Sequence, residues 1–510
     1  MNKLDAQTIF ESNGGNKYVH DSKTRQTVLC PPILYFLLCL KQTGTEPELW
    51  FRQWKENFIE IDNYGQASRA EIRYYLNKYS LLRKNGFFGT LDHEAYLNAV
   101  MTAEDVKRNL ANAKIVTFET TDKCNLKCAY CGYGKFYDNY DRRSNKNLDF
   151  KVAKRLLTYL QDLWNSPLNC SHDRNIYIGF YGGEPLLNFP LIEEIVHYLE
   201  NSPMRHNRFS FSMTTNALLI NKYMDFLAEH NFNLLISLDG DEDSNGYRVL
   251  KSGKPAYNRI LENVLALKIA YPDYFQNKIN FNAVLHNKNS VTGIFHFFKN
   301  NFSKYPSISP LNTTGIKESL KETFWKTYSN LEESLYKSED YSMIQEEMFI
   351  KLPNIEGLST FLARKTDFYF DTYNELLHAT DEAVRFPTGT CSPFTKKIFV
   401  TVNGNILPCE RIGQTHSLGA VNAQAVHIDC EAIAQKYNSW LAKLRNNCNK
   451  CYNIDLCTQC IFNLDIEKRK PGCKGFINHR AYSQYLSSYL SFLEREPKLY
   501  KEILTKVFVE

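Results

Sequence analysis

The stretch Cys124-Asn-Leu-Lys-Cys128-Ala-Tyr-Cys131 decides the fold of this chain. It directly follows the apolar run at residues 115–120, which predicts a buried strand. A structural zinc site needs four ligands, and the next thirty residues offer no further Cys or His to complete one. Three thiolates instead suit a 4Fe–4S cluster whose fourth iron stays open to an exchangeable ligand. The spacing therefore predicts an iron–sulfur centre at the end of a strand.

Strands and helices alternate after this motif, from residue 115 to about residue 315. Helices of ten to fifteen residues between strands are typical of βαβ units and a parallel sheet. Six units are too few for an eight-stranded barrel, so we expect an α/β fold with a partial (β/α)6 barrel. The strands are expected at 115–121, 175–182, 208–215, 233–239, 278–285 and 307–313, and the helices at 149–164, 190–201, 221–230, 257–271 and 291–300.

Polar and glycine residues follow three of the expected strands, where function collects in parallel barrels. The second strand ends in Tyr181-Gly-Gly-Glu-Pro185, whose two glycines allow a ligand to approach the backbone and whose carboxylate accepts from an ammonium group. The third strand ends in Thr214-Thr-Asn216 and the fourth in Ser237-Leu-Asp-Gly240, with Arg248 eight residues further on. These strand ends are the predicted ligand site.

The cysteine spacing, with Tyr130 before the third cysteine, resembles the signature of the radical S-adenosylmethionine (SAM) superfamily. The resemblance implies that Cys124, Cys128 and Cys131 hold the catalytic cluster, that its open iron is chelated by SAM, and that electron transfer from the cluster gives a 5′-deoxyadenosyl radical. Gly-Gly-Glu resembles the family's motif that binds the SAM amino group. Asn216 lies in a stretch that resembles the family's Thr-Asn-Gly motif after the third strand, with Ala217 in place of the glycine. By the same resemblance Ser237 contacts the ribose and Arg248 the carboxylate. The implied cofactor-binding residues are Tyr130, Gly182, Gly183, Glu184, Asn216, Ser237 and Arg248.

A second cysteine-rich region begins at Cys391 and resembles the SPASM domain, which holds auxiliary 4Fe–4S clusters in peptide-modifying radical SAM enzymes. In it, Asn403-Gly404 is a strong hairpin signal within residues 400–409. The resemblance implies an inner cluster and an outer cluster, although two structural zinc ions are the competing interpretation. The inner cluster lacks a fourth thiolate, so its last iron is either open or held by Cys430. The inner ligands are Cys391, Cys409 and Cys460, and the outer ligands are Cys448, Cys451, Cys457 and Cys473.

The first hundred residues carry no clustered chemistry. A β-hairpin is expected at residues 17–30, followed by helices at 32–41 and 67–77. Such a module resembles the leader-binding elements of peptide-modifying enzymes, which add a peptide strand to a sheet edge; a module that only caps the barrel is the alternative. The predicted domains are an N-terminal α+β module (1–105), the barrel (106–315), a helical bridge (316–385), the SPASM domain (386–475) and a C-terminal helix (476–510).

Composition sets broad limits on partners and compartment. The chain has 510 residues, a net charge of +5 and no basic run interleaved with aromatics, so we expect no nucleic-acid partner. The apolar run at residues 31–40 is too short to span a bilayer, and no signal peptide is recognisable, so we expect no membrane association. Fourteen cysteines at metal-ligand spacings without an export signal predict a reducing cytoplasm.

Both resemblances together imply a radical SAM/SPASM enzyme that modifies a ribosomally made precursor peptide, with a thioether or carbon–carbon crosslink as the expected product. Its cofactors would be SAM, the SAM-binding 4Fe–4S cluster and two auxiliary 4Fe–4S clusters, reduced by flavodoxin or ferredoxin. The first alternative is an anaerobic sulfatase-maturase, which oxidises a protein Cys or Ser to formylglycine. The second is a non-catalytic metal-binding scaffold, in which loss of the cysteine triad would be expected, whereas the triad is intact.

Overall fold

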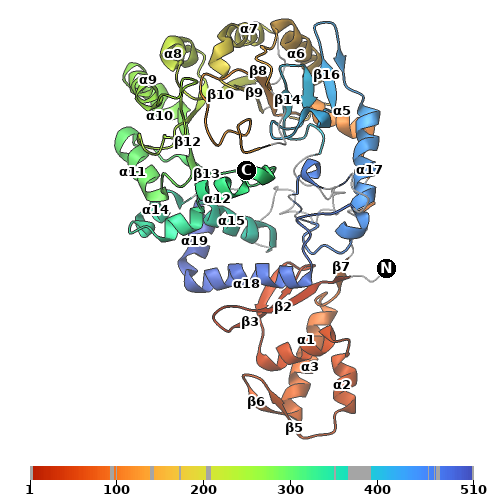
Figure 1. Cartoon of the computed structure of the whole chain (residues 1–510). Coiled ribbons are helices and arrows are strands. Elements are labelled where there is room, and N and C mark those ends of the chain that lie inside the picture. Colours follow the sequence, from red (N-terminus) through yellow and green to blue (C-terminus); the bar gives the residue numbers. More distant parts are fainter. Residues whose placement is uncertain are drawn as a thin grey trace. The chain divides into compact units, whose positions relative to one another are not determined.

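A computed structural model describes residues 4–91, 93, 97–98, 100–137, 143–171, 174–202, 208–349, 352–365, 392–455, 457, 459–464, 466 and 471–507 (Figure 1). The chain forms two compact units, each built from separate stretches of sequence. The barrel unit comprises Met101–Lys351 and Thr390–Ser439, and the terminal unit comprises Met1–Val100, Leu352–Gly389 and Trp440–Glu510. The boundary at Ser439 falls inside the predicted SPASM domain, and the five-domain division stays a prediction.

The barrel unit contains a ten-stranded sheet with the strand order β13-β12-β11-β10-β9-β8-β14-β15-β16-β17. Its first six strands are parallel to one another, and helices lie along their outer side (Figure 1). The alternating strands and helices thus confirm the expected α/β fold. The strands are β8 (Ile115–Thr121), β9 (Asn175–Gly182), β10 (Arg208–Thr215), β11 (Asn233–Ser237), β12 (Ile279–Leu285) and β13 (Ser307–Pro310), and the helices are α5 (Ala103–Ala111), α6 (Phe150–Trp164), α7 (Phe189–Glu200), α8 (Ile220–Glu229), α9 (Tyr257–Ala270), α10 (Pro272–Lys278) and α11 (Val291–Phe302).

Amphipathic spacing explains how these helices cover the sheet. Helix α6 buries Leu156, Leu157, Leu160 and Trp164, which recur at helical spacing on one face. On the strand side, Val116 and Phe118 of β8 are fully buried. The barrel core lies between these two layers, and the polar residues that follow each strand are left at the carboxyl ends.

Several expected boundaries were wrong by one to three residues. The fourth strand ends at Ser237 rather than residue 239, because the Asp239 backbone N–H donates to the Asn245 side chain (3.1 Å) instead of to a neighbouring strand. The sixth strand ends at Pro310 rather than residue 313. Helix α9 ends at Ala270 because Pro272 cannot continue it, and Pro272 instead begins the unexpected helix α10.

The cysteine-rich region continues the barrel sheet. Strands β14 (Ile398–Val400), β15 (Asn405–Leu407), β16 (Gly419–Val421) and β17 (Val426–His427) follow one another, with β14 parallel to β8 and the rest antiparallel. Gly404 forms the predicted turn with a φ of 79°, and an added Cβ there would lie 2.1 Å from the Val421 carbonyl oxygen. Only glycine fits this turn. Helix α17 (Cys430–Cys448) then leads the chain into the terminal unit.

The predicted helical bridge is helical where the structure describes it. In the barrel unit, η2 (Glu318–Leu320), α12 (Lys321–Thr327), α13 (Leu331–Tyr336) and α14 (Tyr341–Glu347) follow β13. In the terminal unit, α15 (Pro353–Lys365) continues the segment.

The terminal unit contains the three-stranded antiparallel sheet β2-β3-β4, with the predicted hairpin formed by β3 and β4. Its main apolar core packs Ile33, Leu34 and Leu37 of α1 against Ile72 and Tyr79 of α3. The elements are β1 (Leu4–Asp5), β2 (Gln7–Glu11), β3 (Lys17–Asp21), β4 (Gln26–Leu29), α1 (Pro32–Gln42), α2 (Pro47–Gln53), β5 (Phe58–Ile61), β6 (Gly65–Ser68), α3 (Arg69–Lys84), β7 (Thr90–Leu91), α15, η5 (Ile461–Asn463), α18 (His479–Arg495) and α19 (Pro497–Lys506).

Two helix predictions in this unit needed correction. Helix α3 begins at Arg69 rather than residue 67, because Ser68 caps it in a reciprocal capping box with Glu71, and it runs on to Lys84. The single C-terminal helix is two helices, α18 and α19, because Pro497 lacks the N–H needed to continue α18 and begins α19. None of the helices described is long and apolar enough to cross a membrane.

Candidate functional site

The three cysteines of the motif lie in one loop directly after β8, and all three are half-buried. Burial is the main cause that raises the pKa of the Cys128 thiol to about 12, and the neighbouring Cys131 and Cys124 thiols contribute to this rise. Burial likewise raises the pKa of Cys124. Thiols with raised pKa values stay protonated without a metal, so cluster binding must displace their protons. The structure thus gathers the predicted triad in one place.

A second segment of the barrel unit holds this loop in position. Lys127 N–H donates to the Val249 carbonyl (2.8 Å) and Ala129 N–H donates to the Tyr247 carbonyl (3.1 Å). Cys128 therefore lies opposite Arg248, between two backbone hydrogen bonds.

Gly182 and Gly183 lie tightly against the start of the cysteine loop. The Gly183 N–H donates to the Thr121 carbonyl (2.9 Å), and an added Cβ at Gly183 would lie 1.8 Å from the Lys123 carbonyl oxygen. Gly182 has a φ of 138°, which only glycine adopts readily. No side chain fits at either position, because the start of the cysteine loop packs directly against the backbone at the end of β9.

Glu184 is fully buried behind these glycines. Its carboxylate accepts from Thr215 Oγ1 (2.8 Å) and from the backbone N–H of Asn216 (2.8 Å), so it joins the ends of β9 and β10. Burial raises the pKa of Glu184 to about 7, against the lowering effect of these hydrogen bonds. An ammonium group beside this carboxylate would favour its ionised form.

Asn216 connects the third strand to the cysteine loop. Its amide nitrogen donates to the Asn125 side chain (2.7 Å) and lies 3.9 Å from the Cys124 sulfur. Ala217 adopts a φ of 63°, in the left-handed region that glycine enters more easily than alanine.

Ser237 and Arg248 both lie at the end of β11. Ser237 is paired in register with Asn282 of β12. Arg248 is buried and forms a two-point ion pair with Asp239, through Nε (2.9 Å) and Nη2 (3.1 Å). The expectation that Arg248 contacts the SAM carboxylate did not include this partner, and only Nη1 lies outside the pair.

Asp239 lies within the predicted Ser237–Gly240 stretch, but no role for its side chain was predicted. Its buried carboxylate also accepts from the Tyr130 hydroxyl and from the Val284 backbone N–H (2.9 Å). His286, directly after β12, places Nε2 3.7 Å from the same carboxylate. The available sequence signal was an aspartate and a histidine that each follow a barrel strand.

The outer auxiliary cysteines line one pocket in the terminal unit. Cys448, Cys451, Cys457 and Cys473 all border this cavity of about 240 Å³. Burial is the main cause that raises the pKa of Cys448 to about 12, and the other three thiols contribute to this rise. All four predicted outer ligands are therefore neighbours.

The inner auxiliary cysteines are distributed differently. Cys409 follows β15 in the barrel unit, where its thiol lies 3.7 Å from the Glu410 carboxylate. Cys460 belongs to the terminal unit, and Cys391 lies outside the described residues. Cys430 begins α17 beside Lys107 and Asp429. The inner ligand set, including the role of Cys430, stays a prediction.

Among the described residues, no three Cys, His, Asp or Glu side chains converge on one point as a single bound ion requires. The thiolates of a 4Fe–4S cluster bind separate irons and need not meet at one point.

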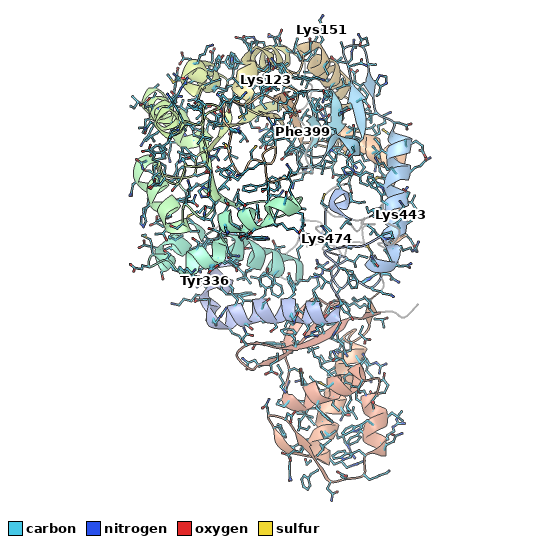
Figure 2. All side chains as sticks on the ribbon, viewed as in Figure 1. Lys123, Lys151, Tyr336, Phe399, Lys443 and Lys474 are labelled. Carbon is cyan, nitrogen blue, oxygen red and sulfur yellow. The ribbon has the colours of Figure 1, made fainter. Side chains whose placement is uncertain are left out.

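Strand pairing joins the two cysteine regions within the barrel unit. Ile398, Phe399 and Val400 of β14 pair with Val116, Thr117 and Phe118 of β8. The Val402 N–H also donates to the buried Glu119 carboxylate (3.0 Å). Figure 2 labels Lys123, which precedes the triad, and Phe399 of β14. The hairpin that carries Cys409 is thus fixed to the strand that carries the triad.

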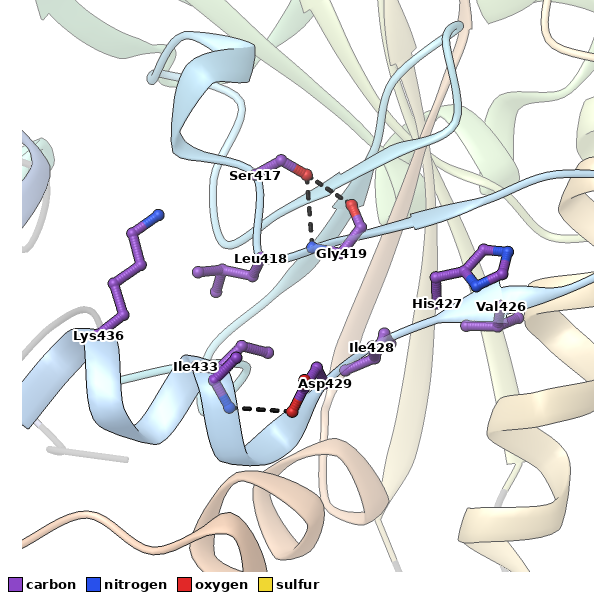
Figure 3. A pocket seen from close by; sticks show the side chains of 10 residues that line it. Ser417, Leu418, Gly419, Val426, His427, Ile428, Asp429, Ile433 and Lys436 are labelled. Carbon is purple, nitrogen blue, oxygen red and sulfur yellow. Dashed lines mark hydrogen bonds between the residues drawn. The ribbon is translucent and has the colours of Figure 1, made fainter.

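A separate pocket lies at the outer end of the sheet, between β16, β17 and α17 (Figure 3). Ser417, Asp429 and Lys436 are among its lining residues. The Ser417 hydroxyl donates to the Gly419 carbonyl (2.5 Å), and the Asp429 carboxylate accepts from the Ala432 N–H (2.9 Å). These hydrogen bonds stabilise the local turns, and the pocket contains none of the predicted site residues.

Comparisons with known proteins agree with this site. The model of the radical SAM superfamily matches residues 118–291, which include the triad and the ends of β8 to β12. An uncharacterised protein of Methanocaldococcus jannaschii is 38% identical over 156 residues, but these cover 30% of this chain and about half (49%) of that relative.

Two further relatives match over more of their length. The radical SAM cyclopropyl synthase TigE of Paramaledivibacter caminithermalis is 22% identical over 88% of this chain and 89% of its own. The cysteine-type anaerobic sulfatase-maturating enzyme of Clostridium perfringens is 24% identical over 73% of this chain and 92% of its own.

Among solved structures, native anSMEcpe with bound AdoMet superimposes with a TM-score of 0.52 at 18% identity, over 77% of this chain and 99% of that one. At this identity the match concerns the fold alone. The radical SAM superfamily uses SAM and a 4Fe–4S cluster, and both fit the triad and the glycines beside it. Residues 118–291 therefore form a radical SAM domain, and the chain is similar to radical SAM enzymes, among them the anaerobic sulfatase-maturating enzymes.

Proposed function

We propose that this enzyme modifies a ribosomally made precursor peptide and forms a carbon–carbon bond or a thioether in it. The observation that carries the proposal is the pairing of β14 with β8, which fixes the Cys409 hairpin to the strand of the catalytic triad. A bond-forming reaction that leaves an unpaired electron on the product needs an electron acceptor near the substrate. An auxiliary cluster held in part by Cys409 would provide one.

The relatives support both the substrate class and the bond. TigE, which matches most of this chain, is named a cyclopropyl synthase, and a cyclopropane ring requires a new carbon–carbon bond. A further solved structure of anSMEcpe, with AdoMet and the Cp18Cys peptide, matches with a TM-score of 0.50. A peptide substrate and carbon–carbon bond formation are therefore our first choice.

When bound, SAM and the triad cluster supply a 5′-deoxyadenosyl radical, which abstracts hydrogen from the substrate. The chain itself binds and orients SAM and the substrate and shields the radical. Gly182 and Gly183 let the end of β9 pack closely against the cysteine loop, and they are assigned with the Glu184 carboxylate to the SAM amino group. Ser237 is assigned to the ribose, and the Nη1 side of Arg248 to the carboxylate.

The auxiliary ligands follow the same proposal. Cys448, Cys451, Cys457 and Cys473 would hold the outer cluster in the pocket that they line. Cys391, Cys409 and Cys460 would hold the inner cluster, with the last iron open or bound by Cys430. Flavodoxin or ferredoxin would supply the reducing electron, in a cytoplasmic setting.

The N-terminal sheet is proposed to bind the leader of the precursor. Its β2 edge is covered, because Ser483 and Ser487 of α18 donate to the carbonyls of Ile9 (3.4 Å) and Glu11 (2.6 Å). The β4 edge carries Leu29, which is 60% exposed. An uncovered edge strand can accept a peptide as a further strand.

The test is an anaerobic reaction of the reconstituted full-length chain with SAM, dithionite and candidate precursor peptides. We expect 5′-deoxyadenosine together with a peptide product that has lost two hydrogens, mapped by tandem mass spectrometry. The triple variant of Cys124, Cys128 and Cys131 to Ala should give neither, whereas Cys170→Ala, at an exposed cysteine, should behave as the parent. SAM cleavage by the triple variant would contradict the proposal.

An anaerobic sulfatase-maturase remains the second candidate, favoured by the match to nearly the whole length of the Clostridium perfringens enzyme. It would convert a Cys or Ser of a sulfatase-derived peptide to formylglycine. An aldehyde-specific hydrazide probe on that peptide distinguishes the two reactions, because a crosslinked product contains no aldehyde.

A further inference from the structure

The Asp239 carboxylate lies at the point where three segments of the SAM site meet. It joins the end of β11, strand β12 through the Val284 N–H, and the cysteine loop through the Tyr130 hydroxyl. The Asp239 backbone is held as well, because its N–H donates to Asn245 (3.1 Å) and its carbonyl accepts from Asn289 (3.2 Å). A side chain that is 0% exposed and fixed on all sides has one conformation.

The Asp239–Arg248 pair connects this junction to the middle cysteine of the triad. Arg248 stands between Tyr247 and Val249, whose carbonyls accept from Ala129 and Lys127 on either side of Cys128. The Arg248 guanidinium also lies 5.5 Å from the centre of the Tyr130 ring. Asp239 is thus connected to the cysteine loop twice: directly through Tyr130, and through Arg248, whose two neighbours in the chain bond to the residues on either side of Cys128.

We propose that Asp239 is a positioning residue for SAM binding, which sets the cysteine loop at Tyr130 and orients Arg248 so that its Nη1 side faces the SAM carboxylate. A buried, hydrogen-bonded ion pair holds its geometry more tightly than an exposed pair, because each broken contact leaves a buried charge without a partner. The inference does not depend on which peptide the enzyme modifies.

The reference variant is Tyr130→Phe, which removes one hydroxyl and leaves the ion pair intact. The matched control is Tyr271→Phe, since the Tyr271 hydroxyl donates to the Asp225 carboxylate (2.9 Å) on the exposed outside of the same unit. Both variants lose one tyrosine–aspartate hydrogen bond, but only Tyr130 lies beside the triad.

Two properties of the anaerobically reconstituted full-length protein are measured. The first is the dissociation constant for SAM, determined by isothermal titration calorimetry. The second is the change that SAM causes in the EPR spectrum of the reduced triad cluster. Both measurements are made well below the melting temperature of each variant. We expect Tyr130→Phe to weaken SAM binding about tenfold to a hundredfold, which is the range for one hydrogen bond to a charged group, and to alter the SAM-dependent EPR change. Tyr271→Phe should match the parent in both.

Asp239→Asn provides a second arm through a double-mutant cycle. If Tyr130 acts through Asp239, then adding Tyr130→Phe to Asp239→Asn should weaken SAM binding further by less than twofold. If Asp239→Asn does not fold, Tyr130→Phe and its control decide alone.

If Asp239 only stabilises the fold, the opposite result is expected. In that case Tyr130→Phe lowers the melting temperature but leaves the SAM affinity and the EPR change of the folded protein as in the parent, and the proposal is overturned. An equal loss of SAM affinity in Tyr271→Phe overturns it too.

Discussion

Ala217 holds a left-handed backbone conformation, with a φ of 63°, between Asn216 and the helix that follows. A Cβ disfavours this region by roughly 1–2 kcal/mol, whereas glycine enters it freely but costs more entropy on folding. We therefore expect Ala217→Gly to stabilise the barrel unit by about 1 kcal/mol in urea unfolding. Ala228→Gly, inside helix α8, is the matched control and should destabilise by about the same amount. A loss of stability in Ala217→Gly would contradict the argument.

Glu184 makes the stability of the ligand-free protein depend on pH. Its pKa rises from an ordinary 4.5 to about 7 in the folded chain. The folded state therefore holds this proton more firmly than the unfolded state. The resulting stabilisation is complete below pH 4.5 and is lost as the pH rises through about 7.

Glu184→Gln removes this titration. The difference in unfolding free energy between about pH 5 and about pH 8 should shrink by up to about 3 kcal/mol compared with the parent. Urea denaturation at both pH values measures it, and Glu262→Gln on the exposed side of α9 is the control. An unchanged difference in Glu184→Gln would show that this carboxyl is not the group responsible.

At the scale of elements, sequence reasoning located most of the barrel because its signals are local. Apolar runs bounded by turn residues placed β8, β9 and β10 with their observed ends, and Gly404 placed the hairpin turn. Pairings between distant segments have no such signal. The contact of Tyr130 with Asp239 spans 109 positions, and nothing local in either stretch indicates that β14 extends the sheet at β8. The motif residues therefore lie where the sequence placed them, whereas the side chains that hold them were not predicted, and the ligand roles of the motif residues stay predictions.

The hairpin turn offers a test of the link between β14–β15 and iron binding. In Gly404→Ala the new methyl would lie 2.1 Å from the Val421 carbonyl oxygen, so the turn cannot keep its shape. We expect the inner cluster near Cys409 to be lost and iron to fall by about four per chain, with SAM cleavage at the triad retained.

The control for this variant is Gly253→Ala. Gly253 also has a positive φ, 83°, but no atom lies within 4 Å of an added Cβ. It shares the backbone strain and lacks the collision, so its iron content should match that of the parent. Equal iron loss in both variants would mean that strain alone, and not the hairpin, is responsible.

Removing one backbone N–H tests whether the leader peptide pairs with the β4 edge. The Cys30 N–H donates to the Lys17 carbonyl on β3 (2.7 Å). Successive backbone N–H groups of a strand point to opposite sides, so the N–H of Leu29 points away from the sheet. Leu29→Pro removes that donor, whereas Leu29→Ala keeps it and removes only the side chain. If the leader adds as a strand, we expect Leu29→Pro to weaken binding of the modified precursor by about tenfold and Leu29→Ala by less, measured by fluorescence anisotropy. Equal effects of the two would favour the module that only caps the barrel.

At the scale of the whole molecule, the proposal divides the reaction between two sets of cysteines. The triad cleaves SAM, and the auxiliary clusters accept the electron left on the product. Cys451→Ala, in the pocket of the outer set, should therefore lower the iron content from about twelve to about eight per chain. It should still release 5′-deoxyadenosine but yield little modified peptide, because an electron accepted by the cluster near Cys409 then has no outer cluster to pass to. Iron analysis, deoxyadenosine assay and peptide mass spectrometry on one sample separate these steps. If Cys451→Ala forms the peptide product at the parental rate, the outer cluster takes no part in the reaction, and only an acceptor near Cys409 remains.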